Sequence, residues 1–298
     1  MLDVGFFDSL VFDRFSIYSI PMKLQPVVAG SFYPGERKKL LSLLDAFEKE
    51  NRVSLPGEPD AFVLPHAGYV YSGAVAALGY RALTAPVETV VVMGPSHFYS
   101  FKGVSLFAGE SVVTPLGELP VDQEACGFLM EQNGFIAEIP QAFAREHSVE
   151  VHLPMVYHYF PGAKVVPIVM GQGMEQAVKP LSRALLALRE KKKFLLIASS
   201  DLSHYPSYER AKKADGDFLE SLLSGDEQKV DAMDEEIMAR KYPEYYCTHC
   251  GREPVATLLK FAKGIGADKI KCLAYRNSGD VTGDRNRVVG YAAVAFCK

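Results

Sequence analysis

Three histidines hold equivalent places in the sequence, each within five residues of the end of a run that predicts a buried strand. They are His66, His97 and His204, which follow the runs 61–64, 89–93 and 194–199. In open α/β sheets, ligands bind outside the carboxyl ends of the strands, and imidazole is the commonest metal-binding side chain. The placement therefore predicts a shared metal or ligand site. The alternative is that each histidine separately caps a strand or hydrogen-bonds to a backbone carbonyl.

Two cysteines form a Cys-x-x-Cys pair just before a predicted helix. Cys247 and Cys250 precede a helix expected from Pro254, and the N-terminus of a helix favours the negative charge of a thiolate. The spacing also fits half of a zinc site or a redox pair, but the sequence has no second pair to complete a zinc ribbon. The alternative is two ordinary buried thiols. The remaining cysteines, expected in the core, are Cys126, Cys272 and Cys297.

Residues 145–154 are dense in ionisable side chains. Those that could hold metal-bound imidazoles in place or line the pocket are Glu146, His147, Glu150 and His152. The alternative is a solvated helix start with Ser148 as its N-cap. Asp201 lies three residues before His204 and is the carboxylate expected to orient that imidazole.

Predicted strands and helices alternate after residue 22. The expected strands are 61–64, 89–93, 164–170, 194–199, 270–275 and 288–296, and the expected helices are 40–47, 73–78, 175–191, 215–223, 234–240 and 254–262. Such alternation predicts an α/β fold, here a single layered domain around a central, mainly parallel sheet. Two further runs, 104–107 and 111–114, are split by Ala-Gly-Glu and predict a β-hairpin.

Composition narrows the class of protein. The chain has 298 residues, a net charge of −4 and no apolar run near the ~18 residues of a membrane-spanning helix. Acidic residues number 36 against 32 basic ones, so no net positive field attracts nucleic acid. Five cysteines do not make a disulfide framework and indicate a reducing, cytoplasmic setting. Residues 1–21 are interpreted as an N-terminal extension, with the domain spanning 22–298.

Six motifs, in order along the chain, resemble the Memo (mediator of cell motility) family. They are 26–34 (PVVAGSFYP), 65–73 (PHAGYVYSG), 94–97 (GPSH), 146–154 (EHSVEVHLP), 199–204 (SSDLSH) and 250–254 (CGREP). The fold of that family resembles class III extradiol dioxygenases, which hold non-haem iron(II) with two histidines and a carboxylate. The resemblance implies that His66, His97 and Cys250 line a metal site. It also implies that His204, with Asp201 beside it, supports the ligands or acts as the acid–base residue.

The resemblance also implies a cofactor and a set of functions. Memo proteins are associated with iron or copper; iron(II) is expected first, although a thiolate ligand shifts preference toward copper(I) or zinc. The first hypothesis is a dioxygenase-like redox enzyme acting on a small molecule. The substrate is unknown, because likeness of fold alone does not transfer activity. The alternatives are a binding module for a peptide or protein partner, an iron- or copper-handling protein, and a zinc hydrolase. Prokaryotic members are often encoded beside a radical-SAM protein, which implies a functional link.

Two further groups of side chains bear on the ligand. Tyrosines accompany the histidine motifs and either pack in the core, as expected first, or line an aromatic pocket; they are Tyr69, Tyr71, Tyr99 and Tyr205. Animal Memo proteins are associated with phosphotyrosine peptides, and clustered arginines recognise such ligands. The candidate arginines are Arg252, Arg276, Arg285 and Arg287, the last three in a polar segment that predicts a solvated hairpin.

Overall fold

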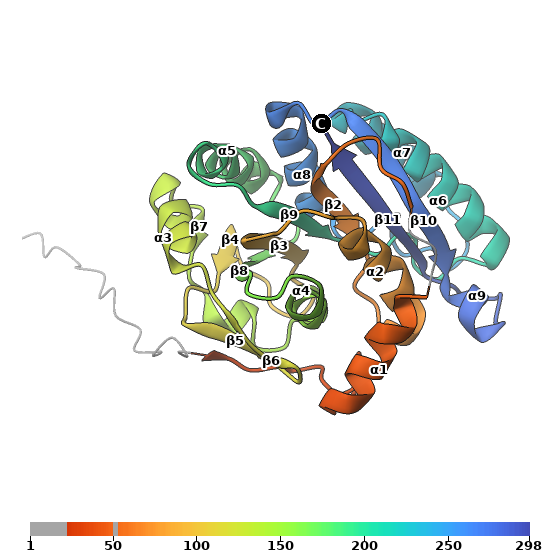
Figure 1. Cartoon of the computed structure of the whole chain (residues 1–298). Coiled ribbons are helices and arrows are strands. Elements are labelled where there is room, and N and C mark those ends of the chain that lie inside the picture. The colour runs from red at the N-terminus through yellow and green to blue at the C-terminus, as the bar shows by residue number, and fades with distance from the viewer. Residues whose placement is uncertain (1–22, 50–52) are drawn as a thin grey trace, which may run out of the picture.

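Eight strands form the main sheet in residues 23–49 and 53–298, the part of the chain that the computed structural model describes (Figure 1). In spatial order they are β10 (Lys269–Asn277), β11 (Gly290–Cys297), β2 (Pro59–Leu64), β9 (Leu195–Ser199), β3 (Thr89–Pro95), β8 (Lys164–Met170), β4 (Val104–Leu106) and β7 (Ile136–Ala137). The central four, β2, β9, β3 and β8, are parallel, and the predicted fold class is confirmed. The expectation for residues 1–21 lies outside the described residues.

Helices cover both faces of this sheet (Figure 1). They are α1 (Arg37–Phe47), α2 (Ala74–Arg81), α3 (Gln123–Gln132), α4 (Leu153–Tyr159), α5 (Glu175–Lys191), α6 (Tyr208–Leu223), α7 (Glu227–Ala239), α8 (Arg252–Ile265) and α9 (Ser278–Thr282). Helix α8, with α5 beside it, packs on one face, and α2, with α4 beside it, packs on the other. None of the helices in the described residues has the length and apolarity that crossing a membrane requires.

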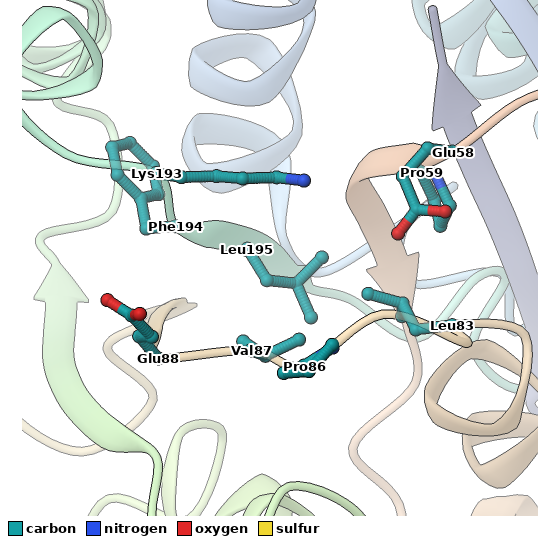
Figure 2. Close-up of a pocket in the computed structure, with 9 residues that line it drawn as sticks. All are labelled: Glu58, Pro59, Leu83, Pro86, Val87, Glu88, Lys193, Phe194 and Leu195. Carbon is teal, nitrogen blue, oxygen red and sulfur yellow. The ribbon is translucent and has the colours of Figure 1, made fainter.

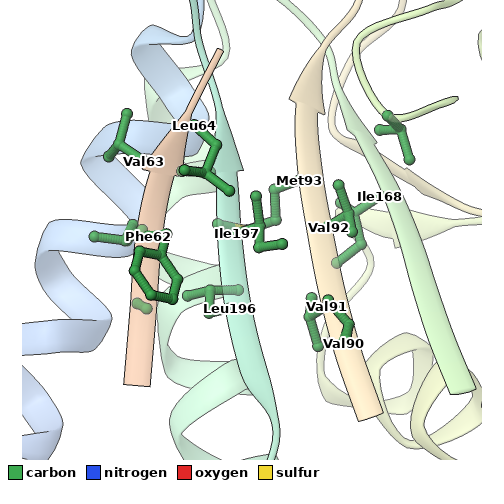
Figure 3. Packing of buried hydrophobic residues seen from close by; sticks show 14 of the residues in the cluster. Phe62, Val63, Leu64, Val90, Val91, Val92, Met93, Ile168, Leu196 and Ile197 are labelled. Carbon is green, nitrogen blue, oxygen red and sulfur yellow. The ribbon is translucent and has the colours of Figure 1, made fainter. Parts of the chain in front are cut away.

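The core of the sheet explains its continuous apolar strands. Because helices lie on both faces, side chains pointing either way from a central strand are buried. Residues 90–93 of β3 are all fully buried and pack against Leu196 and Ile197 of β9 (Figure 3). Burying each such side chain is worth about 1.5–3 kcal/mol, so the strands form a rigid frame. The loops at their carboxyl ends start from fixed points.

The predicted hairpin of 104–107 and 111–114 is wrong. Strand β4 belongs to the main sheet, where it is antiparallel to β8, whereas β5 (Ser111–Thr114) lies in a small sheet between β1 (Lys23–Leu24) and β6 (Gly117–Pro120). Two residues separate β5 from β6, and a connection of that length closes a tight antiparallel hairpin. Residues 107–110 instead carry the chain from one sheet to the other.

Candidate metal centre

Loops from neighbouring strands meet at the carboxyl edge of the sheet, because β2, β9 and β3 are adjacent. His66 comes two residues after β2 and His97 two residues after β3, and their ring centroids lie 5.2 Å apart. Asp201, two residues after β9, accepts hydrogen bonds from the backbone N–H groups of His66 (2.8 Å) and Ala67 (3.3 Å). The carboxylate thereby ties the loop after β2 to the loop after β9.

His147 completes a cluster of three imidazoles. Among the described residues, His66, His97 and His147 each offer a ligand atom, and these atoms lie within 4.8 Å of one another. The His147 ring stacks on His97, with centroids 4.8 Å apart, and Phe32 packs on it at 4.6 Å. Burial lowers the pKa of His147 to about 4 and that of His66 well below its usual value, so both rings are neutral and able to bind metal. Sequence reasoning had placed His147 among the supporting residues.

Cys250 joins the cluster from the far end of the chain. Its Sγ lies 3.2 Å from Nε2 of His66 and accepts a hydrogen bond from the backbone N–H of Asp201 at 3.3 Å. The residue that follows, Gly251, leaves no room for a side chain, because a Cβ there would lie 2.5 Å from the carbonyl oxygen of Ser199. Burial, and then the charge of Asp201, raise the pKa of the Cys250 thiol well above its usual value. The sulfur is therefore a thiol in the metal-free protein.

Glu146 binds the ring of His97 and the backbone of both His97 and His147. Its carboxylate accepts hydrogen bonds from the backbone N–H groups of His97 (2.5 Å), His147 (3.0 Å) and Ser148 (2.8 Å), and from Nδ1 of His97 (2.9 Å). Burial alone would raise the pKa of Glu146, but the hydrogen bonds from His97 outweigh it and lower the pKa. An ionised Glu146 fixes the hydrogen of His97 on Nδ1 and leaves Nε2 free.

His204 lies on the wall of the same pocket but is not oriented by Asp201 as expected. Its Nδ1 donates to the carbonyl oxygen of Leu202 at 2.8 Å and lies 3.4 Å from Sγ of Cys247. Asp201 instead binds the loop after β2, and burial raises its pKa to about 7. The separation of three residues placed the two side chains in one loop without fixing where either one points.

Glu150, His152 and Tyr69 are outside the lining of the pocket. Glu150 accepts hydrogen bonds from the backbone N–H groups of Val27 (2.7 Å) and Val28 (3.0 Å) and from the hydroxyl of Tyr33 (2.6 Å), so it anchors the segment that carries Phe32. Tyr69 is buried, and its hydroxyl donates to a backbone carbonyl at 2.6 Å. His152 is hydrogen-bonded to Ser199 and Tyr80, each at 2.9 Å.

The alternative interpretation of residues 145–154, a solvated helix start, does not hold either. Glu146, Ser148, Glu150 and His152 are all buried. The hydroxyl of Ser148 donates to the carbonyl oxygen of Pro95 at 2.8 Å rather than capping a helix. Helix α4 begins later, at Leu153, with Pro154 in its first turn.

A pocket of about 800 Å³ opens over the cluster. The predicted site residues that line it are His66, His97, His147, Asp201, His204 and Cys250. Aromatic rings that line the pocket are partly exposed: Tyr71 (39%), Phe98 (52%), Tyr205 (41%) and Tyr246 (75%). The core packing expected of Tyr71, Tyr99 and Tyr205 is therefore wrong, since Tyr99 is also 41% exposed, whereas it holds for Tyr69. Phe98, Tyr205 and Tyr246 lie in irregular segments beyond the sheet, and Tyr71 lies in a π-helical turn (Tyr69–Gly73).

The candidate arginines contact different parts of the structure. Arg252 lines the pocket. Arg285 stacks over Tyr208 with 4.5 Å from Cζ to the ring centroid, and Arg287 stacks over Tyr205 at 4.9 Å. The predicted hairpin is confirmed, since β10 and β11 are paired antiparallel strands, with α9 in their connection.

A smaller pocket, of about 140 Å³, lies at the opposite edge, where β2, β3 and β9 begin (Figure 2). Apolar side chains such as Leu83, Val87 and Leu195 line it, with charged groups at its margin (Figure 2). It holds none of the histidines or cysteines, and strand starts are not where open α/β sheets bind their ligands. The larger pocket is the candidate site.

The donor set at the larger pocket fits a transition metal. Imidazole nitrogen and thiolate sulfur suit iron, copper and zinc. A nitrogen and a sulfur bonded to one ion lie roughly 3–3.5 Å apart, in agreement with the 3.2 Å between His66 and Cys250. Nδ1 of His147 is buried without a hydrogen-bond partner, with the nearest oxygen of Glu146 3.5 Å away. A buried polar atom of this kind has room in its hydrogen-bonding capacity for a water, a ligand or an ion.

Comparisons with known proteins agree with the motifs. A family model described as "Memo-like protein" matches residues 25–295. A MEMO1 family protein of Methanobrevibacter smithii is 37% identical over 289 residues, covering 92% of this chain and 100% of that protein. One from Aquifex aeolicus is 34% identical over 278 residues, covering 91% and 98%. The crystal structure of an uncharacterized Escherichia coli K12 protein covers 79% of this chain and 98% of its own, with a TM-score of 0.54 and 18% identity, a likeness of fold alone.

Proposed function

The chain belongs to the Memo family, and from that premise we propose that it is a metal-dependent redox enzyme whose His66, His97 and Cys250 hold iron(II). The observation that carries this proposal is the 3.2 Å approach of the Cys250 sulfur to Nε2 of His66, beside the cluster of imidazoles in the large pocket. The aromatic lining, which includes Tyr71 and Phe98, favours a small aromatic or enolic substrate.

Each of the three ligands has a lone pair available for the ion. Glu146 accepts a hydrogen bond from Nδ1–H of His97, so the lone pair on Nε2 of His97 is available. Nδ1 of His66 is occupied by Ser199, and its Nε2 faces Cys250. The thiol must lose its proton on binding, since the thiolate is the ligand form. A redox metal bound here supplies one-electron chemistry and polarises a substrate oxygen.

His204 is the base in this proposal. Because Nδ1 donates to the carbonyl oxygen of Leu202, the lone pair of the neutral ring lies on Nε2. Burial lowers the pKa of His204, which keeps the ring neutral at pH 7. A neutral imidazole on the pocket wall can take the proton of a substrate hydroxyl.

His147 separates this proposal from a second one, a protein that handles iron or copper. Three protein ligands leave a position open for substrate, whereas a fourth closes a tetrahedral site. The stacking of His147 on His97 keeps its ring within the cluster of candidate ligand atoms. If His147 also binds the ion, four donors surround the metal, and the handling function is favoured.

Metal analysis of anaerobically purified protein tests the proposal. Near-stoichiometric iron is expected in the natural chain and in Cys272→Ser, a matched control that removes a half-buried thiol on β10. Cys250→Ser should lose most of the metal. Absence of metal from the natural chain under reducing conditions would overturn the proposal.

X-ray absorption of the loaded protein then counts the ligands. An unchanged number of nitrogen ligands in His147→Ala supports an open site and justifies an oxygen-consumption screen of small substrates. Loss of one nitrogen ligand supports metal handling instead.

A further inference from the structure

A chain of buried side chains leads from His66 away from the pocket. Nδ1 of His66 lies 2.7 Å from Oγ of Ser199, which lies 2.9 Å from Nε2 of His152. Nδ1 of His152 lies 2.9 Å from the hydroxyl of Tyr80. None of the four is more than 2% exposed, so water does not compete for these hydrogen bonds. Ser199, His152 and Tyr80 do not line the pocket and have no role in the function proposed above.

A third contact of Ser199, in addition to the two imidazoles, determines where its single hydroxyl hydrogen points. Oγ of Ser199 lies 2.6 Å from the carbonyl oxygen of Ser148, and a carbonyl only accepts, so Ser199 donates to it. Only the lone pairs of Oγ remain for the two imidazoles. His66 therefore donates to Ser199 through Nδ1–H, and His152 donates to the same oxygen through Nε2–H.

Tyr80, at the far end of this series of side chains, determines the tautomer of His152 in the same way. Burial lowers the pKa of His152 to about 3, so the ring is neutral at pH 7 and carries one hydrogen, on Nε2. Its Nδ1 then accepts from the hydroxyl of Tyr80. The ring of Tyr80 is held in turn by stacking on Tyr159, with centroids 5.7 Å apart and an interplanar angle of 17°.

We propose that Ser199, His152 and Tyr80 are positioning residues that lock His66 in its Nδ1–H tautomer and so present the Nε2 lone pair toward Cys250. An imidazole binds a metal through the nitrogen that lacks a hydrogen, and the partner of the other nitrogen decides which one that is. The benefit to metal binding rests on the proposed function, but the tautomer itself is a property of the metal-free chain.

Nitrogen-15 NMR of the metal-free protein tests the tautomer directly. Ring nitrogen shifts of His66 should show a protonated Nδ1 and a bare Nε2 in the natural chain. In Ser199→Ala the acceptor is gone, so a substantial Nε2–H population should appear at His66. In Tyr80→Phe the donor to His152 is gone, so the Nδ1–H population of His152 should rise. Tyr159→Phe is the matched control. The ring of Tyr159 stacks on Tyr80, and its buried hydroxyl, which the substitution removes, has no hydrogen-bond partner.

The results separate the two proposals. A bare Nδ1 at His66 in the natural chain, or a His66 tautomer that does not change in folded Ser199→Ala, overturns the positioning role. If Ser199→Ala does not fold, Tyr80→Phe tests the proposal instead. An unchanged tautomer of His152 in that variant overturns the positioning role of the series from Ser199 to Tyr80, and a changed tautomer supports it. If the natural chain binds no metal but the tautomer of His66 changes in Ser199→Ala, the positioning role is supported and the proposed function is overturned.

Metal affinity gives an independent second readout. Competition with a chromophoric chelator should show a roughly 10–100-fold weaker affinity for Zn²⁺ in Ser199→Ala, the usual effect of removing a partner of a metal-bound histidine. Tyr159→Phe should match the natural chain. Equal affinity in the natural chain and in folded Ser199→Ala would overturn the claimed benefit to binding.

Discussion

Sγ of Cys250 lies 3.2 Å from Nε2 of His66, although 184 positions of sequence separate the two residues. In the metal-free protein Cys250 keeps its hydrogen as a thiol, because burial raises its pKa well above the usual value. Binding of Zn²⁺ at pH 7 should therefore release about one proton from Cys250. Calorimetry in buffers of different ionisation enthalpy measures this number. Cys250→Ser should lack that proton, and equal proton release in both proteins would contradict the assignment of Cys250 as a ligand.

Glu146→Gln should weaken metal binding by about 10–100-fold. The carboxylate accepts four hydrogen bonds, three of them from His97 and His147. A neutral amide has one acceptor oxygen and would direct its NH₂ group at some of these donors. Chelator competition measures the affinity. Glu138→Gln is the control, because the carboxylate of Glu138 also accepts from a backbone N–H, but that of Ala108 rather than that of a clustered histidine.

His204→Gln should keep its full metal content. Nδ1 of His204 is bound to the carbonyl oxygen of Leu202, and the ring is not part of the cluster of candidate ligand atoms. The metal-to-protein ratio after anaerobic loading checks this prediction. A fall as large as that in Cys250→Ser would make His204 a ligand rather than the base.

Tyr33→Phe should destabilise the protein by about 1.5–3 kcal/mol, the cost of losing a hydrogen bond to a charged partner. The hydroxyl of Tyr33 donates to Glu150 at 2.6 Å, and Glu150 anchors the segment that holds Phe32 against His147. Urea denaturation of the metal-free protein measures the change in the free energy of unfolding. A loss no greater than that in Tyr159→Phe would show that this anchor is not needed for stability.

The contribution of His152 to the stability of the metal-free protein should be lost as the pH drops from 7 to 5. Burial lowers the pKa of His152 to about 3, against 6.5 in the unfolded chain, so below pH 6.5 only the unfolded state takes up this proton. The contribution lost over this interval is about 2 kcal/mol. His152→Gln keeps one donor and one acceptor but does not titrate, so its stability should fall by that much less. Asp201 and Asp215, whose pKa values burial raises to about 7 and about 6, oppose the trend equally in both proteins. Parallel pH profiles for the two proteins would refute the assignment.

Much of the frame could be predicted from local pattern. The run 164–170 and the helix 175–191 appear with the predicted bounds, because a buried parallel strand is apolar throughout and a surface helix alternates its faces. Histidines after strand ends were correctly expected to converge, since parallel strands share one edge. The prediction of a hairpin in residues 104–114 was wrong, because these residues do not reveal their pairing partners. Each run pairs with a strand from another part of the sequence.

Side-chain direction in the site was less accessible. His147 lies in an irregular segment, and its ring is held in the cluster by packing against Phe32, over a hundred residues earlier, and by stacking on His97. Ser199 had a visible signal, since a polar residue ends an otherwise apolar buried strand. The role of that hydroxyl depends on Ser148 and His152, which fold against it from a different segment. Such contacts are set by the tertiary structure and not by spacing.

The strand order also has a consequence for synthesis of the protein. Strand β9 lies between β2 and β3 in the sheet, yet a ribosome makes it about a hundred residues after β3. The nascent chain thus carries His66 and His97 before it has the strand that sets their spacing, and well before Cys250. A growing polypeptide therefore lacks the complete pocket until β9 and Cys250 have been made.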